Sequence, residues 1–413
     1  MPPFKTSRLP FYYGWIIVVT GTFGTIASLG FGRFALGMLL PSMAETLQLS
    51  YSQMGFISTG NFFGYLVAVF FGGMIIARIG QRLFVFLCLL LAGITMALLS
   101  RAETFAALLA LYVLTGMGSG GANVSVMSLA STWFGRRSRG RAAGYMVVGS
   151  GYAMIFTGFF IPYVNRTVGA EGWRTSWMAL AGLVVLISFL CLLFLRNRPA
   201  DLGLEIQGEA SGDAGRHAAA PAEANVSIYG NRTLYHLGAI YFLFGFTYVI
   251  YATFIVTTLV KERGLSESLA GSFWSVVGFL SLFSGPVFGS ISDKLGRKAG
   301  MIIVFSIQFL AYLLVASDLP GIFLYLSIFC YGIVAWSIPA IMAAAAGDYA
   351  GPNHAAKALG FITLIFGMGQ MAGPAVAGIL AQNTGSFSSS FYMAAALAGL
   401  AILLSALLKK PQH

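Results

Sequence analysis

The sequence predicts an all-α integral membrane protein in which twelve transmembrane helices form two six-helix halves. Three observations predict this fold. Hydrophobic residues make up 58% of the 413 residues and charged residues only 9%, which is typical of a chain whose solvent is mostly lipid. Twelve apolar runs are long enough to cross a bilayer, and one short loop motif occurs twice.

The apolar runs are close to or longer than the ~20 residues that a helix needs to span the hydrocarbon core of a bilayer. Six of them lie near residues 12–40, 53–77, 83–100, 105–133, 141–164 and 175–195. The other six lie near residues 234–260, 268–291, 299–316, 321–347, 356–381 and 388–408. The first run is too long for the core of a signal peptide and lacks a small-residue cleavage site, so we expect it to stay as the first helix.

A single long polar segment, residues 196–232, separates the two sets of six runs. It is rich in Ala, Gly and Ser and poor in large apolar residues, so it cannot bury a core and is expected to be a flexible linker. The predicted domains are residues 1–195 and residues 233–413, each a six-helix bundle.

Lys and Arg side chains outside the spans are distributed unequally between the two sets of loops. With the N-terminus inside the cell, eighteen lie on the cytoplasmic side, and five lie on the other side: Arg101, Arg166, Arg174, Lys261 and Arg263. This asymmetry predicts that both termini and the linker are cytoplasmic.

Several classes of function are excluded by composition. The net charge of +11 does not indicate nucleic-acid binding, because the basic residues fall in short clusters between apolar runs and form no basic face with interleaved aromatics. The three cysteines, Cys88, Cys191 and Cys330, lie within apolar runs and show neither disulfide nor metal-ligand spacing. No nucleophile–base arrangement or nucleotide loop is recognisable. We therefore expect no cofactor, no metal and no enzyme activity.

The repeated loop motif joins corresponding spans of the two halves. GMIIARIGQR begins at Gly73 and GSISDKLGRK begins at Gly289, 216 positions later. The second copy resembles the loop signature of the major facilitator superfamily, as do WFGRRSRGRAAG from Trp133, GWR from Gly172, RNRPADLGL from Arg196 and GQMAGPAVAG in the eleventh span. These motifs are spread over essentially the whole chain.

The resemblance implies a secondary transporter that works by alternating access. Two bundles related by pseudo-twofold symmetry would enclose a cavity near the middle of the membrane. It further implies a monomeric, multi-pass protein of a bacterial inner membrane, with the lipid bilayer, a small-molecule substrate and protons as its partners.

The resemblance also implies a gate at the cytoplasmic face. Asp293 would cap a helix start, and the basic residues would engage carboxylates and helix ends, fastening the halves together when the cavity opens outward. The expected gate residues are Asp293, Lys294, Gly296, Arg297 and Lys298 in the second copy and Arg78 and Arg82 in the first. The first copy departs from the pattern, with Ala77 in place of the acid and Gln81 in place of a basic residue. Alternatively, these charges only satisfy the asymmetry between the two membrane faces.

One cation, Arg33, lies within the first span. It follows Trp15 by 18 residues, which at ~1.5 Å per residue places it roughly 27 Å along the helix, in the outer half of the bilayer or near its outer boundary. It either extends outward or caps a carbonyl as a structural cation, or it contacts an anion in the cavity. YYGW at Tyr12 followed by this cation resembles the first helix of monocarboxylate transporters, which favours the anion contact.

By these boundaries no Asp or Glu lies inside a span, and the four histidines lie in loops, at helix ends or at the terminus. A proton that is coupled to transport is therefore expected to travel with the substrate. The eighth and eleventh spans also lack the cation that the bacterial monocarboxylate and oxalate:formate carriers would lead us to expect, which argues against a dicarboxylate.

Other polar and aromatic side chains at middle depth are candidates to bind substrate, although each could equally pack between helices. They are Asn61, Tyr65, Asn123, Tyr152, Tyr248, Tyr251, Trp274, Tyr331, Trp336 and Gln370. Asn123 and Gln370 are favoured because a buried amide without partners is costly. We expect Asn61 and Tyr65 to hold Arg33 toward the cavity, because they lie at a similar depth in the second span.

The sequence therefore predicts a secondary active transporter of a small, monocarboxylate-like organic anion, linked to protons or working by exchange. The alternative is an exporter of hydrophobic or drug-like compounds, which the 35 Phe and 16 Met residues would suit. Phe and Met also face lipid or pack in cores, so composition does not favour that alternative.

Overall fold

The computed structural model describes residues 11–135, 138–207, 230–351 and 354–409. Twelve helices in it are long and apolar enough to cross a membrane, one for each predicted span, so the predicted fold class is confirmed. In the N-terminal half they are α1 (Gly14–Thr25), the π-helix η2 (Ile26–Phe34) and α2 (Ala35–Thr46), which together form the first span, α3 (Tyr51–Ile79), α4 (Gln81–Leu99), α5 (Phe105–Trp133), α6 (Arg139–Val168) and α7 (Gly172–Phe194).

The C-terminal half repeats this plan. Its elements are α8 (Arg232–Thr257) continued by the π-helix η5 (Thr258–Glu262), α9 (Glu267–Leu295), α10 (Arg297–Ala316), α11 (Ile322–Val334) and α12 (Ser337–Ala350), which together form the tenth span, α13 (Ala355–Thr384) and α14 (Ser388–Leu407). Among the described residues neither half contains a β-strand. Phe134 and Gln207 form one isolated β-bridge.

The repeated loop motif owes its glycine to backbone conformation. Gly80 separates α3 from α4 with φ +80° and ψ 159°, and Gly296 separates α9 from α10 with φ +90° and ψ 154°. A residue with a Cβ avoids this region of φ/ψ space. The chain therefore reverses between two spans over a single residue at the same place in each half.

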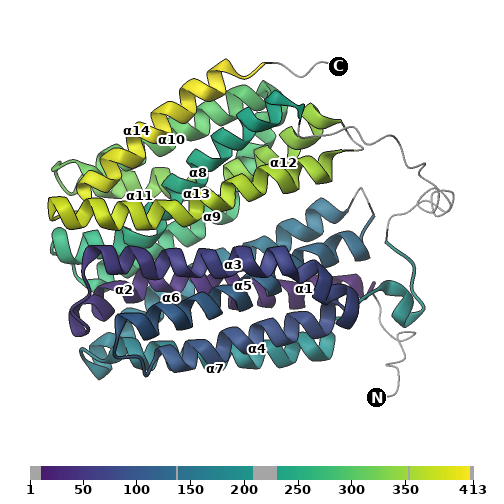
Figure 1. Cartoon of the computed structure of the whole chain (residues 1–413), viewed down its shortest axis with the longest axis horizontal. Helices are drawn as coiled ribbons and strands as arrows, with labels where there is room; N and C mark the ends of the chain where they lie inside the picture. The colour runs from purple at the N-terminus through teal and green to yellow at the C-terminus, as the bar shows by residue number, and fades with distance from the viewer. Residues whose placement is uncertain (1–10, 136–137, 208–229, 352–353, 410–413) are drawn as a thin grey trace.

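The two halves lie side by side in Figure 1, the N-terminal half in purple to blue and the C-terminal half in green to yellow. We call the end of the molecule at which α1 and α8 begin and residues 196–207 lie the linker side, and the opposite end the distal side. The ribbons of the halves lie together at the distal side and diverge toward the linker side.

The interface between the halves, here called the seam, is formed by α3 with α13, α6 with α9, and α2 with α8. Glycines allow backbones to touch across it: a Cβ added to Gly55 would lie 2.3 Å from the Pro374 carbonyl oxygen, and one on Gly37 would lie 2.7 Å from that of Ala252. At the distal end Tyr51 packs edge-on against Phe387, with 4.9 Å between ring centroids. The seam is therefore closed at its distal side.

The first part of the predicted linker is packed against the N-terminal half. The Gly135 N–H donates to the Gln207 carbonyl at 3.0 Å, and the Tyr12 hydroxyl donates to the Glu205 carbonyl at 2.9 Å. Residues 196–207 thus continue the N-terminal bundle, whereas residues 208–229 of the predicted flexible linker lie outside the described residues.

Close helix packing inside the N-terminal half depends on Gly116. A Cβ there would lie 2.0 Å from the Asn61 carbonyl oxygen of α3, so Gly116→Val should force α3 and α5 apart. We expect a cost of at least about 1–3 kcal/mol and a lower melting temperature of the purified protein. Gly182→Val on α7 is the control, because a Cβ at Gly182 meets nothing within 4 Å. Equal melting temperatures for the two variants would contradict the prediction.

Candidate functional site

Arg33 lies a few residues past the centre of the first span, on its distal side, because that span covers Gly14–Thr46 and extends beyond residue 40. It belongs to the π-helical segment η2, a geometry that is frequent at functional sites. Glycines on either side allow the segment to pack closely: a Cβ on Gly30 would lie 2.0 Å from the Ala153 Cβ, and one on Gly32 would lie 2.2 Å from the Ser119 Oγ.

The Arg33 side chain is buried between α2, α3 and their neighbours, with 8% of its surface exposed. Its Nε donates to the Asn61 Oδ1 at 3.4 Å, and its Cζ lies 4.4 Å from the ring centroid of Phe62 and 4.2 Å from that of Tyr65. Two aromatic rings and one amide therefore hold the guanidinium, and Asn61 and Tyr65 lie where the sequence analysis expected them.

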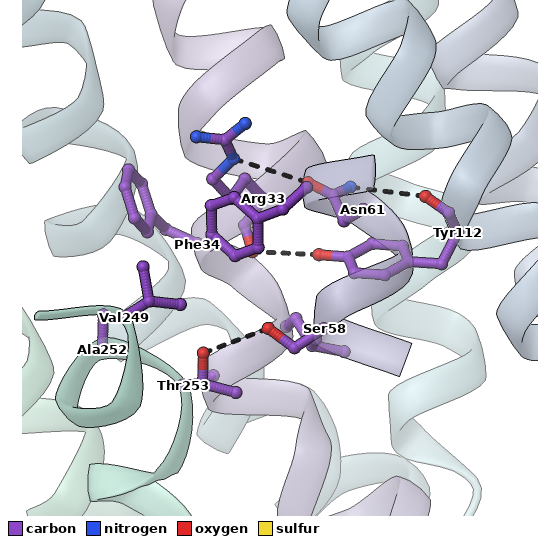
Figure 2. A pocket seen from close by; sticks show the side chains of 11 residues that line it. Arg33, Phe34, Ser58, Asn61, Tyr112, Val249, Ala252 and Thr253 are labelled. Carbon is purple, nitrogen blue, oxygen red and sulfur yellow. Dashed lines mark hydrogen bonds between the residues drawn. The ribbon is translucent and has the colours of Figure 1, made fainter. Parts of the chain in front are cut away.

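The neighbouring amide and phenol fix the backbone that carries Arg33. Asn61 Nδ2 donates to the Gly32 carbonyl at 3.1 Å and to the Tyr112 carbonyl at 3.4 Å. The Tyr112 hydroxyl donates to the Arg33 carbonyl at 3.0 Å. Figure 2 shows the bonds from Asn61 to Tyr112 and from Tyr112 to Arg33, with the guanidinium extending away from Ser58 and Thr253. Sequence reasoning missed Tyr112, which no motif marks.

The C-terminal half faces Arg33 with aromatic and amide side chains. The Trp336 ring packs against the Phe34 ring across the seam, with 5.2 Å between ring centroids, and against the Tyr248 ring, with 5.8 Å between centroids. The Tyr248 hydroxyl accepts a hydrogen bond from Gln370 Nε2. Trp336 lies between α11 and α12, where its backbone N–H donates to the Ser284 Oγ at 3.1 Å. The tenth span is thus interrupted at Trp336, the residue whose ring contacts Phe34 of the first span.

Three buried polar atoms around this part of the seam have no hydrogen-bond partner among the described residues: Arg33 Nη2, Trp336 Nε1 and Asn123 Oδ1. Asn123 uses its Nδ2 to donate to the Tyr65 hydroxyl at 3.1 Å. Buried polar groups are nearly always paired, so two donors and an acceptor left over in one region indicate a binding site. We call Arg33, Asn61, Tyr65, Asn123, Tyr248, Trp336 and Gln370 the seam cluster.

The distal side of Arg33 is shut. Ser58 and Thr253 hydrogen-bond across the seam at 3.2 Å, and a cavity of ≈ 10 Å³, room for one water at most, remains between them and Arg33. Figure 2 shows this arrangement. A ligand of the seam cluster would therefore reach it from the linker side in this conformation.

Three of the predicted binding residues lie elsewhere. Tyr251 and Tyr331 stack on each other inside the C-terminal bundle, with 4.0 Å between ring centroids. The Tyr251 hydroxyl and the Ser327 Oγ form a hydrogen bond of 2.9 Å. The Tyr331 hydroxyl donates to the Tyr248 carbonyl at 3.0 Å. Tyr152 is 50% exposed, on the same face of α6 as the exposed Phe159 and Tyr163. Core packing accounts for the first two, and Tyr152 belongs to an exposed aromatic stripe on α6.

The gate residues of the second loop motif pair within their own half. Arg297 forms ion pairs with Asp293 and, through its Nε at 2.6 Å, with the Asp348 Oδ2 of α12. Asp293 does not cap a helix start here, because it lies in the last turn of α9 and Gly296 occupies the N-cap position of α10. Lys294 and Lys298 are exposed. In this conformation the ion pairs that the motif forms with described residues join α9, α10 and α12, all within the C-terminal half.

The first loop motif makes neutral contacts at the corresponding places. Gln81 Nε2 donates to the Ser128 Oγ of α5 at 2.7 Å, where the second copy has the Arg297 ion pairs. Arg82 Nε donates to the Leu192 carbonyl at 2.6 Å, and Arg78 is exposed. The first motif thus has an amide hydrogen bond from Gln81 at the place where the second motif has the ion pairs of Arg297.

Comparison with known proteins agrees with this architecture. A family model described as "Uncharacterised MFS-type transporter YbfB" matches residues 25–406. The hexuronate transporter of Bacillus subtilis is 25% identical over 90% of this chain and 89% of its own length. A probable sulfoacetate transporter, SauU, of Cupriavidus necator is 24% identical over 90% of this chain and 89% of its own length.

Solved structures show the same fold. A bacterial homologue of the human lysosomal transporter Spinster, crystallised in an inward-facing and unoccupied conformation, superposes with a TM-score of 0.76. It is 16% identical, and the match covers 96% of this chain and 97% of that one. With the twelve spans, the repeated motif and the matched family model, the chain belongs to the major facilitator superfamily, in the YbfB family, and is a membrane transporter and not an enzyme.

Proposed function

We propose that this protein carries a small organic anion with a single carboxylate across the membrane by alternating access, and that Arg33 binds the carboxylate. The observation that carries the proposal is the buried Arg33 guanidinium, whose Nη2 has no partner among the described residues. The names of the relatives from Bacillus subtilis and Cupriavidus necator support an organic-anion substrate.

The geometry leaves one edge of the guanidinium for a ligand. Its Cζ lies over the rings of Phe62 and Tyr65, and Asn61 accepts from its Nε. None of the ion pairs between described residues involves Arg33. A buried charge without a counterion costs several kcal/mol, and a carboxylate that bridges the two terminal nitrogens offsets this cost with two parallel hydrogen bonds.

The other side of the site suits the uncharged body of the substrate. Trp336 presents an unpartnered Nε1 beside an apolar ring, and Gln370 and Tyr248 present an amide and a hydroxyl. Arg33 is the cation of the described spans that lies at middle depth, so a second carboxylate would lack a partner. These features favour a monocarboxylate with polar substituents over a dicarboxylate.

The positions of the acidic residues bear on how transport is coupled to an energy source. Of the acids at the ends of the spans, Asp348 pairs with Arg297 at the linker side, and Glu267 accepts from the Asn165 Nδ2 at 2.9 Å at the distal side. Neither lies beside Arg33. We therefore propose that protons enter with the substrate, or that one anion exchanges for another.

Orientation follows from the charge asymmetry. With the linker side, which carries most of the Lys and Arg residues, at the cytoplasm of a bacterial inner membrane, this conformation opens inward. The substrate would then be bound or released at the cytoplasm in the state described here. We propose a monomer as the working unit.

Substitution of Arg33 tests the role of the guanidinium. Arg33→Gln removes the charge and should weaken binding by on the order of 2 to 5 kcal/mol, or about thirtyfold or more. Arg33→Lys keeps the charge but loses the two-pronged geometry and should weaken binding less. Affinity for a panel of monocarboxylates, dicarboxylates and lipophilic cations is measured by thermal shift on the purified proteins.

The control is Arg101→Gln, which removes an exposed cation outside the spans and should leave affinity unchanged. The melting temperature of the ligand-free Arg33→Gln protein should not fall, because removal of a buried charge relieves a desolvation cost. Normal carboxylate affinity in Arg33→Gln, or stabilisation of the wild type by lipophilic cations alone, would overturn the proposal.

Trp336 provides a second, smaller test. Trp336→Phe keeps an aromatic ring against Phe34 but removes the Nε1 donor, so affinity should fall by about 0.5–1.5 kcal/mol, or roughly two- to twelvefold. Tyr152→Phe, which removes a hydroxyl from the exposed face of α6, should have no effect on affinity. Equal binding constants for the two variants would remove Trp336 from the site.

A further inference from the structure

Asn123 and Tyr65 place an unused hydrogen-bond acceptor beside an unused donor. Asn123 Nδ2 donates to the Tyr65 hydroxyl at 3.1 Å, and the buried Asn123 Oδ1 has no partner among the described residues. The Tyr65 hydroxyl accepts in this bond and donates in none of the bonds between described residues, so its own hydrogen is available. One ligand group that both donates and accepts can therefore satisfy the amide and the phenol together.

This pair lies close to the guanidinium, on its linker side. The Arg33 Cζ is 4.2 Å from the ring centroid of Tyr65, the side chain that bonds Asn123. On α5 the Tyr112 hydroxyl bonds the Arg33 carbonyl, and Asn123 follows Tyr112 toward the linker side. A ligand that enters from the linker side and places its carboxylate on Arg33 therefore has the rest of its molecule beside Asn123 and Tyr65.

The C-terminal half adds two more donors to the seam cluster. Trp336 Nε1 is buried without a partner among the described residues. The Tyr248 hydroxyl accepts from Gln370 Nε2 and is near enough to Arg33 to interact with it electrostatically. Its hydrogen, like that of Tyr65, is not donated in any bond between described residues. These donors suit oxygen atoms on the body of the ligand.

A hydroxyl is the substituent that matches these groups, because it donates one hydrogen bond and accepts two. An aliphatic acid has no donor for the Asn123 Oδ1 and would leave that buried atom unpaired, and a keto group only accepts. An ammonium donates, but it would lie near Arg33, and Asp348 and Glu267, at the ends of their spans, do not balance it.

We propose that the anion carried by this protein is a hydroxylated monocarboxylate of the sugar-acid class, and that Asn123 with Tyr65 recognises one of its hydroxyls. The carboxylate binds Arg33. One hydroxyl donates to the Asn123 Oδ1 and accepts from the Tyr65 hydroxyl, and a further hydroxyl accepts from Trp336 Nε1. This inference rests on the contact between Arg33 and a carboxylate proposed above. It makes Asn123 the residue that distinguishes a hydroxylated acid from an aliphatic acid of the same length.

Two acids of equal chain length test the proposal on the wild-type protein. Gluconate carries a hydroxyl on every carbon beyond its carboxylate, and hexanoate carries none. Gluconate should bind at least tenfold more tightly, because hexanoate leaves buried polar groups of the site unpaired. Sorbitol, which has the hydroxyls without the carboxylate, should bind more weakly than gluconate. The affinities are measured by isothermal titration calorimetry on the purified protein.

Asn123→Ala then removes the acceptor. Affinity for gluconate should fall roughly two- to twelvefold, as for the loss of one hydrogen bond, and the ratio of gluconate to hexanoate affinity should fall with it. Asn383→Ala, which removes an exposed amide at the distal end of α13, is the matched control and should keep the wild-type ratio. A ratio of two affinities does not respond to a general loss of folded protein, so it reports recognition and not stability.

The outcomes separate this inference from the proposed function. Equal wild-type affinities for gluconate and hexanoate, both lost in Arg33→Gln, would overturn the recognition of hydroxyls and leave the carboxylate contact standing. Absence of binding for both acids would overturn the proposed function together with this inference. Sorbitol bound as tightly as gluconate would overturn the sugar acid as the ligand, and a wild-type ratio in Asn123→Ala would overturn the role of Asn123.

Discussion

A positive charge in the middle of a membrane protein needs either a counterion or a function. Arg33 is 8% exposed, lies on a π-helical turn and takes part in none of the ion pairs between described residues. The surrounding contacts hold the guanidinium in place without neutralising it, since its Cζ lies over two aromatic rings and one amide accepts from its Nε. The close packing of η2, its flanking glycines and the bonds from Asn61 and Tyr112 all support this one side chain.

Two interrupted helices meet at the site, one from each half. The first span widens into a π-helix at Ile26–Phe34, and the tenth span breaks between Val334 and Ser337. Phe34 and Trp336, at these two interruptions, touch each other across the seam. Irregular backbone is tolerated at membrane depth where it lines a cavity, and here it brings a cation and an indole donor to the same place.

The two halves share a plan but not their charges. Arg297 and Gln81 occupy equivalent positions of the repeated motif, yet the arginine pairs with two carboxylates while the glutamine bonds a serine. Gly80 and Gly296, by contrast, have nearly the same φ and ψ. Backbone geometry is therefore retained in both copies, while the ionic network at the linker side belongs to the C-terminal half.

By itself the sequence determined the twelve spans and the superfamily, because span length and motif spacing are local properties. It also selected Arg33 and paired it with Asn61 and Tyr65, since depth along a span can be counted. Only the tertiary structure decided that Tyr152 is exposed, that Tyr251 is core and that Asp293 pairs with Arg297. These outcomes depend on how each helix is rotated about its axis. Because transmembrane helices are apolar on most sides, sequence periodicity does not reveal that rotation, and packing between helices sets it.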